Sequence, residues 1–265
     1  MSLRYRVQRF LTHPAPLRTV VLRSLRRLLP YEFSVITSAA ERPHYGYCLL
    51  QGARLARCLG HRSMSAIEFG VAAGQGLLAL ERHAVHVERL TGVKIDLYGF
   101  DSTYGLPQPK DYRDLPYHWQ QGLFLTDREA LKRRLTRATL VEGDVSETVP
   151  QFLNTTPAPI GAIFHDLDFY SSTAAAFGIF DIAEGCRLPR IFNYFDDVAG
   201  NEMVLCNEHT GELLAIQEYN ACHKQQKLAQ IRYFQGSVPF KWHAQVYIHH
   251  DFTHSDYCVF VSEPA

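Results

Sequence analysis

The segment Ser65–Gly76 reads SAIEFGVAAGQG, an apolar run that ends in closely spaced glycines. Its first residues, Ser65–Phe69, have the composition of a buried strand, and Leu77–Leu90 repeats apolar residues at helical spacing. Glycine between a strand and a helix lets the backbone turn tightly and lets a ligand approach the free N–H groups of the helix N-terminus. The segment is therefore predicted to begin an α/β sheet and to border a binding site.

Strands and helices continue to alternate along most of the chain. The other predicted helices are Tyr45–Leu59, Asp127–Leu135, Ser146–Leu153 and Ser172 to about Glu184. The other predicted strands are Lys94–Phe100, Ala138–Glu142, Ile160–Phe164 and Arg190–Phe195. This alternation predicts an α/β fold, a doubly wound and mostly parallel seven-stranded sheet with helices on both faces.

Two aromatic and β-branched runs near the end of the chain, Trp242–His249 and Tyr257–Ser262, have no helix between them. Parallel neighbours need a crossover of a dozen or more residues, so two strands this close must be antiparallel. We therefore expect the sheet to finish in a C-terminal antiparallel hairpin.

Three carboxylates stand where a nucleoside cofactor would need them. Glu68, just before the glycines, would repel a pyrophosphate but suits the positively charged amino-acid part of S-adenosylmethionine. Asp101 ends the next strand, where it can accept hydrogen bonds from both ribose hydroxyls. Asp144 follows the third strand and has two interpretations: a partner for the adenine amino group, or an N-cap for the helix Ser146–Leu153.

A second acidic set follows two further buried strands. Asp166 comes after one of them, and Asp196-Asp197 come after the other. Carboxylates at buried strand ends are costly unless they are hydrogen-bonded or bind a metal, and ligands that are all oxygen favour Mg²⁺ or Mn²⁺ over zinc. We expect these three to bind one ion, with Asp168 as general base; Asp168 could instead cap the following helix. His165 is either a further ligand or proton relay, or a histidine satisfied by its neighbours.

The N-terminal part of the chain is basic and amphipathic. Residues 3–29 carry seven arginines, no acidic residue precedes Glu32, and apolar residues recur near helical spacing after Pro16. We predict a helical extension over residues 1–40 and a main domain over residues 41–265. The extension either contacts a membrane surface or packs on the domain or a second subunit, as in a homodimer. No segment approaches the ~20 apolar residues that span a bilayer.

Composition narrows the class of protein. The 27 basic and 27 acidic residues balance, which argues against nucleic acid as the main partner. The six cysteines show no C-x-x-C spacing, as expected for reduced thiols in a cytoplasmic protein, which would be membrane-peripheral if the extension binds lipid.

Five motifs together resemble the macrocin O-methyltransferase family, metal-dependent enzymes that methylate hydroxyls of sugars and related natural products. They are Glu68–Gly74, Tyr98–Pro107, Val141–Asp144, Asp166–Thr173 and Asp196-Asp197. The resemblance implies a Rossmann-like methyltransferase fold, Asp168 as base, and Asp166, Asp196 and Asp197 as ligands of Mg²⁺ or Mn²⁺. The residues that it implies around S-adenosylmethionine are Glu68, Gly70, Ala72, Gly74, Asp101, Ser102, Asp144, Val145 and Asp166.

The expected activity is therefore methylation of a small-molecule hydroxyl substrate. The loop Thr103–Gln121, rich in tyrosine and charge, is expected to cover that substrate, with Arg42, His44 and Tyr45 at another edge. Two alternatives are an NAD-dependent oxidoreductase and a methyltransferase-like binding protein without catalytic activity. Glu68 and the closing hairpin oppose the first alternative, and the intact acidic positions oppose the second.

Overall fold

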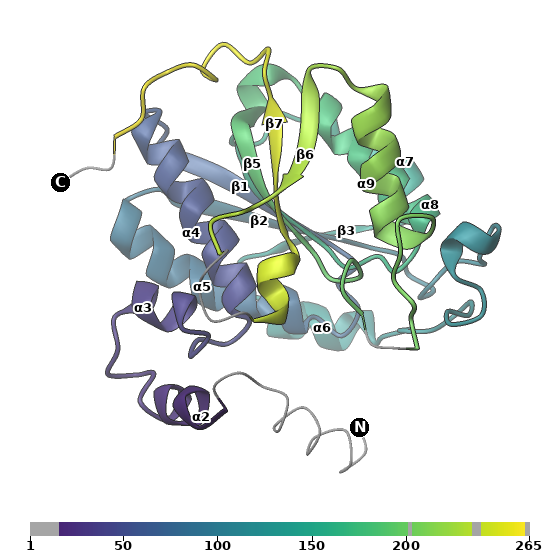
Figure 1. The fold of residues 1–265 in the computed structure, drawn as a ribbon, viewed down its shortest axis with the longest axis horizontal. Coiled ribbons are helices and arrows are strands. Elements are labelled where there is room, and N and C mark those ends of the chain that lie inside the picture. Colours follow the sequence, from purple (N-terminus) through teal and green to yellow (C-terminus); the bar gives the residue numbers. More distant parts are fainter. Residues whose placement is uncertain (1–15, 201–202, 235–239, 263–265) are drawn as a thin grey trace.

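A seven-stranded sheet runs through the computed structural model, which describes residues 16–200, 203–234 and 240–262 (Figure 1). The strand order is β3-β2-β1-β4-β5-β7-β6. The strands are β1 Ser63–Phe69, β2 Lys94–Asp101, β3 Thr139–Glu142, β4 Ile160–His165, β5 Arg187–Phe195, β6 Gln226–Gln230 and β7 Val246–Asp251. All neighbours pair in parallel except β7, which is antiparallel to both β5 and β6. The predicted α/β fold, with its mostly parallel seven-stranded sheet and antiparallel end, is confirmed.

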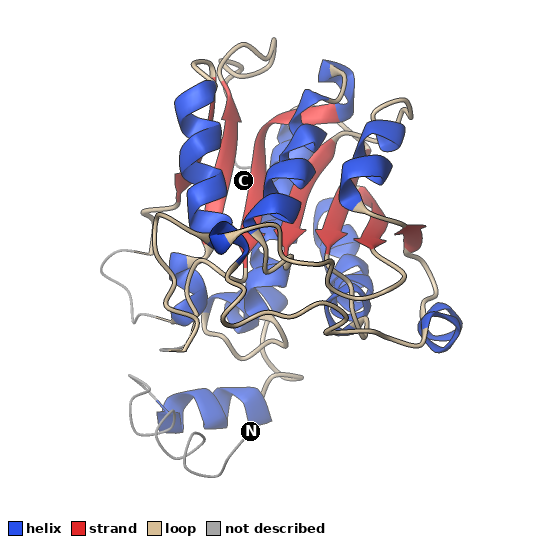
Figure 2. Cartoon of the chain, turned by 90° about the vertical axis from the view of Figure 1, so that its right-hand side faces the viewer, coloured by secondary structure: helices blue, strands red, loops and turns tan. Residues whose placement is uncertain are grey.

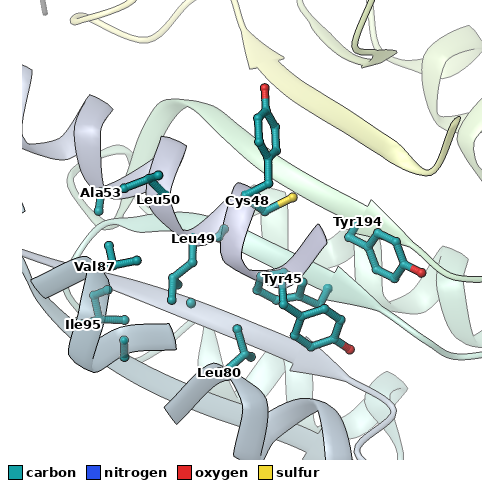
Figure 3. Close-up of a cluster of buried hydrophobic side chains, with 14 of the residues drawn as sticks. Tyr45, Cys48, Leu49, Leu50, Ala53, Leu80, Val87, Ile95 and Tyr194 are labelled. Atoms are coloured by element: carbon teal, nitrogen blue, oxygen red, sulfur yellow. The ribbon is translucent and has the colours of Figure 1, made fainter. Parts of the chain in front are cut away.

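Helices cover both faces of this sheet (Figures 1 and 2). Their bounds are α2 Pro16–Ser24, α3 Tyr31–Ile36, α4 Pro43–Cys58, α5 Gln75–Thr91, α6 Arg128–Arg134, α7 Val145–Phe152, α8 Tyr170–Ala176 and α9 Gly211–Cys222. One apolar core lies under α4 and α5, and a second lies under α7, α8 and α9. Figure 3 shows the first core, in which the hydroxyls of Tyr45 and Tyr194 point toward one end of the cluster.

The antiparallel pair at the end of the sheet differs from the predicted one. Its partner for β7 is β6, a polar strand with one buried side chain, Leu228, so its sequence gave little strand signal. Tyr257–Ser262 forms turns and irregular chain, and Phe260 in it is 87% exposed. The physical reason is that β5 and β6 already occupy both edges of β7, so no backbone groups remain there for another strand.

Two helical predictions also change. The helix expected over Ser172 to about Glu184 is α8, which ends at Ala176 and continues as a 3₁₀ turn over Phe177–Asp181. The structure adds α9, which the sequence pattern did not indicate because apolar residues are spread around this helix instead of along one face.

The N-terminal helices differ in how they meet the body. Helix α3 is attached to it: the hydroxyl of Tyr31 lies 2.8 Å from Nδ1 of His83, and Arg54 pairs with Glu32 at 2.5 Å. Helix α2 lies farther out, beyond α3 (Figure 1). Among the described residues, none of the helices combines the length and the apolar character needed to cross a bilayer.

Candidate functional site

A cavity opens at the carboxyl ends of β1, β2, β3 and β4. Its empty volume is about 780 Å³, part of which is open to solvent. Loops that are far apart in sequence line it together, as expected where the strands of a parallel sheet end at one edge. The predicted site residues among its lining are Gly70, Ala72, Asp101, Ser102, Asp144, Val145, Asp166 and Asp168. Glu68, Gly74, Asp196 and Asp197 are not part of the lining.

Gly70 brings two of these loops into direct contact. Its φ is +83°, and a Cβ at this position would lie 1.8 Å from the carbonyl oxygen of Asp166. The N–H of Asp166 donates to the carbonyl of Phe69 at 3.0 Å, which holds the two loops together. Only glycine allows both this backbone angle and this approach. The loop after β1 and the loop after β4 are therefore fixed to one another by their backbones.

Asp101 is held by a partner that sequence reasoning missed. Its carboxylate accepts from the backbone N–H of Ala72 and from the guanidinium of Arg128, which also donates to the carbonyl of Ser102. The side chains of Asp101 and Arg128 are each only 12% exposed. Arg128 lies at the start of α6, after Asp127, and no motif marked it as functional. The carboxylate of Asp101 thus faces the cavity in an orientation fixed from two sides.

Asp144 fits both interpretations that its position allowed. It is the N-cap of α7, accepting from the N–H of Ser146 at 2.8 Å and from its hydroxyl at 2.6 Å, and it also lines the cavity. Burial would raise the pKa of Asp144, but the hydrogen bonds from Ser146 outweigh it and lower this pKa. The side chain is therefore an ionised acceptor at neutral pH.

Glu68 is buried beneath the glycine turn. The hydroxyl of Tyr45 donates to its Oε1 at 2.6 Å, while its Oε2 has no partner in the part of the chain that the structure describes. Gly76 makes room for this pair, since a Cβ there would lie 1.8 Å from Oε1. Burial raises the pKa of Glu68 to about 7. Tyr45, expected at a substrate edge, is fully buried and supports Glu68.

The acidic residues after β4 and β5 are linked through backbone N–H groups. The N–H of Asp168 donates to Oδ2 of Asp197 at 3.1 Å, and the N–H of Asp197 donates to Oε2 of Glu212 at 3.0 Å. Glu212 lies in α9, is fully buried and has an unpartnered Oε1 among the described residues. Sequence reasoning missed Glu212, because the pattern did not indicate the helix that carries it.

These carboxylates repel one another. Burial first, and then the charges of Asp196 and Asp197, raise the pKa of Asp166 well above its ordinary value. Burial and the same two neighbours do so for Asp168, and burial and Asp196 raise the pKa of Asp197 to about 7. Burial and Asp197 also raise the pKa of Glu212. Such a cluster is costly to ionise, so it favours a proton or a cation among its members.

The predicted metal ligands are close enough to interact electrostatically but are not gathered around one point. Asp196 accepts from the hydroxyl of Tyr194, and Asp197 accepts from the N–H of Asp168. Within residues 16–200, 203–234 and 240–262, no group of three or more His, Cys, Asp or Glu side chains has the arrangement of a metal site. The donor set nevertheless fits a hard cation, because all of its donors are carboxylate oxygens, and the pKa values of Asp166 and Asp197 are raised.

His165 lies in the apolar core and not in the cavity lining. Its ring stacks on Phe195 with 4.3 Å between the ring centres, and its Nε2 lies 3.1 Å from Oδ1 of Asn193. Burial lowers the pKa of His165 to about 3, so the ring is neutral. Its Nδ1 is buried and has no hydrogen-bond partner among the described residues, so its neighbours satisfy only one of the two ring nitrogens.

The loop after β2 lies against the cavity and the residues that follow Asp168. Leu106 and Phe124 line the cavity. Asp114 accepts from the backbone N–H of Ser171 at 2.8 Å and from its hydroxyl at 2.9 Å. The hydroxyl of Tyr117 donates to the carbonyl of Val204 at 2.8 Å. The loop is thus tied to two other segments of the carboxyl edge.

The strand order, the antiparallel seventh strand and a cavity at the switch from β1 to β4 together define the Rossmann-like methyltransferase fold. Solved structures of methyltransferases resemble the chain in fold. CalS11, a calicheamicin methyltransferase, is 23% identical, with 88% of this chain and 90% of that chain covered and a TM-score of 0.52. An O-methyltransferase from Bacillus cereus in complex with SAH is 14% identical, with 88% and 87% covered and a TM-score of 0.39. No family model and no curated protein sequence matches the chain.

Proposed function

We propose that the protein is an S-adenosylmethionine-dependent and divalent-metal-dependent O-methyltransferase that acts on a hydroxyl of a sugar or small natural product. One observation carries the proposal: the same cavity is lined by nucleoside-type residues, such as Gly70 and Asp101, and by the acids Asp166 and Asp168. The acceptor class rests on the motifs around Gly105-Leu106-Pro107 and Asp166–Thr173, which resemble macrocin O-methyltransferases.

Each predicted cofactor residue would contact a different part of S-adenosylmethionine. Asp101, held by Ala72 and Arg128, would accept hydrogen bonds from the ribose hydroxyls. Asp144 and Val145, which line the same cavity, would border the adenine. Gly70 permits close approach of the ligand to the backbone, and Gly74 caps α5. Glu68 lies behind the turn, where its negative charge would attract the amino-acid end of the cofactor.

Asp166, Asp196 and Asp197 would hold Mg²⁺ or Mn²⁺ once the side chains of Asp196 and Asp197 turn away from their present hydrogen-bond donors. When the cofactor and the metal ion are both bound, the sulfonium of the cofactor would supply the methyl group, and the metal ion would favour ionisation of the acceptor hydroxyl. Asp168 is the proposed base: its raised pKa suits a group that must take a proton at neutral pH. The loop that carries Leu106 and Phe124 would exclude water from the cavity.

An oxidoreductase that uses NAD is less consistent with the molecule. The antiparallel β7 departs from the all-parallel dinucleotide-binding sheet, and the buried carboxylate of Glu68 lies where a pyrophosphate would be repelled.

We expect S-adenosylhomocysteine to raise the Tm by several degrees in a thermal-shift assay and NAD to leave it unchanged. The reverse result would support the oxidoreductase. Failure of S-adenosylmethionine to bind by calorimetry would support a non-catalytic protein.

Arg42 provides a test of how the amino-acid end would be bound. Its Cζ lies 5.1 Å from the centre of the Tyr45 ring, and it forms no ion pair or side-chain hydrogen bond with any described residue. Burial acts to lower the pKa of Arg42, but the nearby acidic groups, among them Tyr45, Glu68 and Asp166, outweigh it and raise this pKa. Arg42 is not part of the cavity lining, but its charge interacts with Glu68 and Asp166, and we propose that its guanidinium would pair with the carboxylate of the cofactor.

Arg42→Gln is expected to weaken the binding of S-adenosylhomocysteine by about 10- to 100-fold, the usual worth of a hydrogen-bonded charge pair. Binding of S-adenosyl-3-thiopropylamine, which lacks the carboxylate, should not change. Isothermal titration calorimetry of both ligands with both proteins measures the difference. Equal losses for the two ligands would show that Arg42 only supports the local fold.

A further inference from the structure

Helix α2 and the turn after it turn an apolar side toward solvent. Leu17 is 72% exposed, Val20 and Val21 are 55% exposed, and Leu28 is 82% exposed. Residues three or four apart lie on one side of a helix, so Leu17, Val20 and Val21 share one side of α2. Leu25 and Leu28, in the turn after the helix, are also exposed, and we call these five residues the apolar stripe. Thr19, on the other side, is buried. This is the reverse of a helix that packs on a protein core, whose apolar side faces inward.

Arginines flank this stripe. Arg18, Arg23, Arg26 and Arg27 are all exposed, and Arg23 makes a hydrogen bond with the carbonyl of Ser38 at 3.3 Å. The chain contains no acidic residue before Glu32. An apolar stripe bordered by basic side chains is the pattern of a helix that lies in the plane of an anionic lipid surface, with the apolar residues in the acyl boundary and the arginines among the head groups.

The same charges argue against a second copy of the chain as the partner. In a symmetric dimer the same patch meets itself, so the arginines of one α2 would face those of the other. Residues 16–29 contain no acidic side chain that could neutralise them. A surface of anionic lipid provides both the apolar layer and the negative charge.

The position of α2 relates this surface to the cavity. In Figure 2 the arrowheads of the parallel strands point toward the end of the molecule at which the N-terminal helix lies, whereas β7 runs the other way. The cavity opens at that carboxyl edge. A membrane in contact with α2 would therefore lie at the end of the molecule at which the cavity opens.

We propose that residues 16–29 form an interfacial segment that docks the protein on an anionic membrane surface. Docking itself is independent of the proposed function. If the protein is also the proposed methyltransferase, the acceptor would be a hydroxyl on an amphiphile held in that membrane. This second inference rests on the proposed function.

The test is sedimentation of the full chain with lipid vesicles. We expect the protein to bind phosphatidylcholine vesicles that contain phosphatidylserine at least about 10-fold more tightly than vesicles of phosphatidylcholine alone, with the difference decreasing as salt is added. The triple variant Arg18→Gln, Arg26→Gln, Arg27→Gln and the double variant Leu17→Ser, Val21→Ser should each lose about 10-fold or more. Val85→Ser, at an exposed apolar position on α5, is the matched control and should bind as the wild type does.

Three results would overturn docking: equal binding to both vesicle types, wild-type binding by the charge variant, or a dimer in analytical ultracentrifugation that the Leu17→Ser, Val21→Ser variant dissociates. Binding of S-adenosylhomocysteine by the same variants separates the two proposals. Variants that lose vesicle binding but retain this affinity support docking, whereas a wild-type chain that binds vesicles but not S-adenosylhomocysteine would leave docking intact and remove the proposed methyl transfer.

Discussion

Asp166→Asn is expected to lower turnover by at least about 10³-fold while making the protein without ligands more stable. The loss follows from the removal of a proposed ligand that also lines the cofactor cavity. The gain follows because the carboxylate of Asp166 is destabilised by burial and by the charges of Asp196 and Asp197. Methyl-transfer kinetics and the Tm of one preparation measure the two effects together.

Because the two effects have opposite signs, the result can be told apart from misfolding, which would lower both the activity and the Tm. Asp181→Asn, at an exposed position outside the cavity, is the matched control and should change neither. The metal-dependent mechanism would be refuted if the Asp166→Asn variant and the EDTA-treated wild-type protein both kept full activity.

The second large effect is a loss of stability as the pH rises in protein freed of metal and cofactor. The pKa of Glu68 is about 7 in the folded chain, against an ordinary value of 4.5. Because the folded-state pKa is the higher, the contribution of protonated Glu68 to stability is complete below pH ~4.5 and is lost as the pH rises through ~7. The shift corresponds to roughly 3 kcal/mol, so we expect the Tm to fall by about 5 °C or more between pH 5 and pH 8.

Glu68→Gln tests the assignment of this effect. The amide keeps an acceptor for the hydroxyl of Tyr45 but does not ionise, so the fall in Tm should become smaller. It should not vanish, since Asp166, Asp197 and Glu212 also have raised pKa values. A wild-type Tm that is constant or rises over this range would contradict the raised pKa of Glu68. Scanning calorimetry across the pH series gives the measurement.

The sequence pattern was most informative where one residue type is required by chemistry or backbone geometry. Gly70 and Asp101 were predicted because a close turn needs glycine and a strand-end carboxylate suits a ribose. Arg128 and Glu212 were missed because their roles come from tertiary packing: Arg128 meets Asp101 across 27 positions of chain, and Glu212 lies on a helix without a clear apolar side.

The end of the sheet shows the same limit. The run Tyr257–Ser262 has strand-like composition, whereas β6 is polar, yet β6 pairs with β7. Which segment pairs with β7 depends on which edge of β7 is still free for hydrogen bonding in the folded sheet. Amino-acid composition carries no information about that. Asp196 and Asp197 illustrate a related point, since their order in the chain fixes the strand they follow but not the direction in which each carboxylate points.

The contact between Gly70 and the carbonyl of Asp166 has a consequence for how this scaffold can evolve. Because no side chain separates the loop that would hold the donor from the loop that would hold the acceptor, the spacing between them is set by main-chain atoms alone. Residues farther out, such as those of the loop after β2, can change to admit new acceptors without altering that spacing. The range of substrates can therefore change during evolution while the geometry of the reaction stays the same.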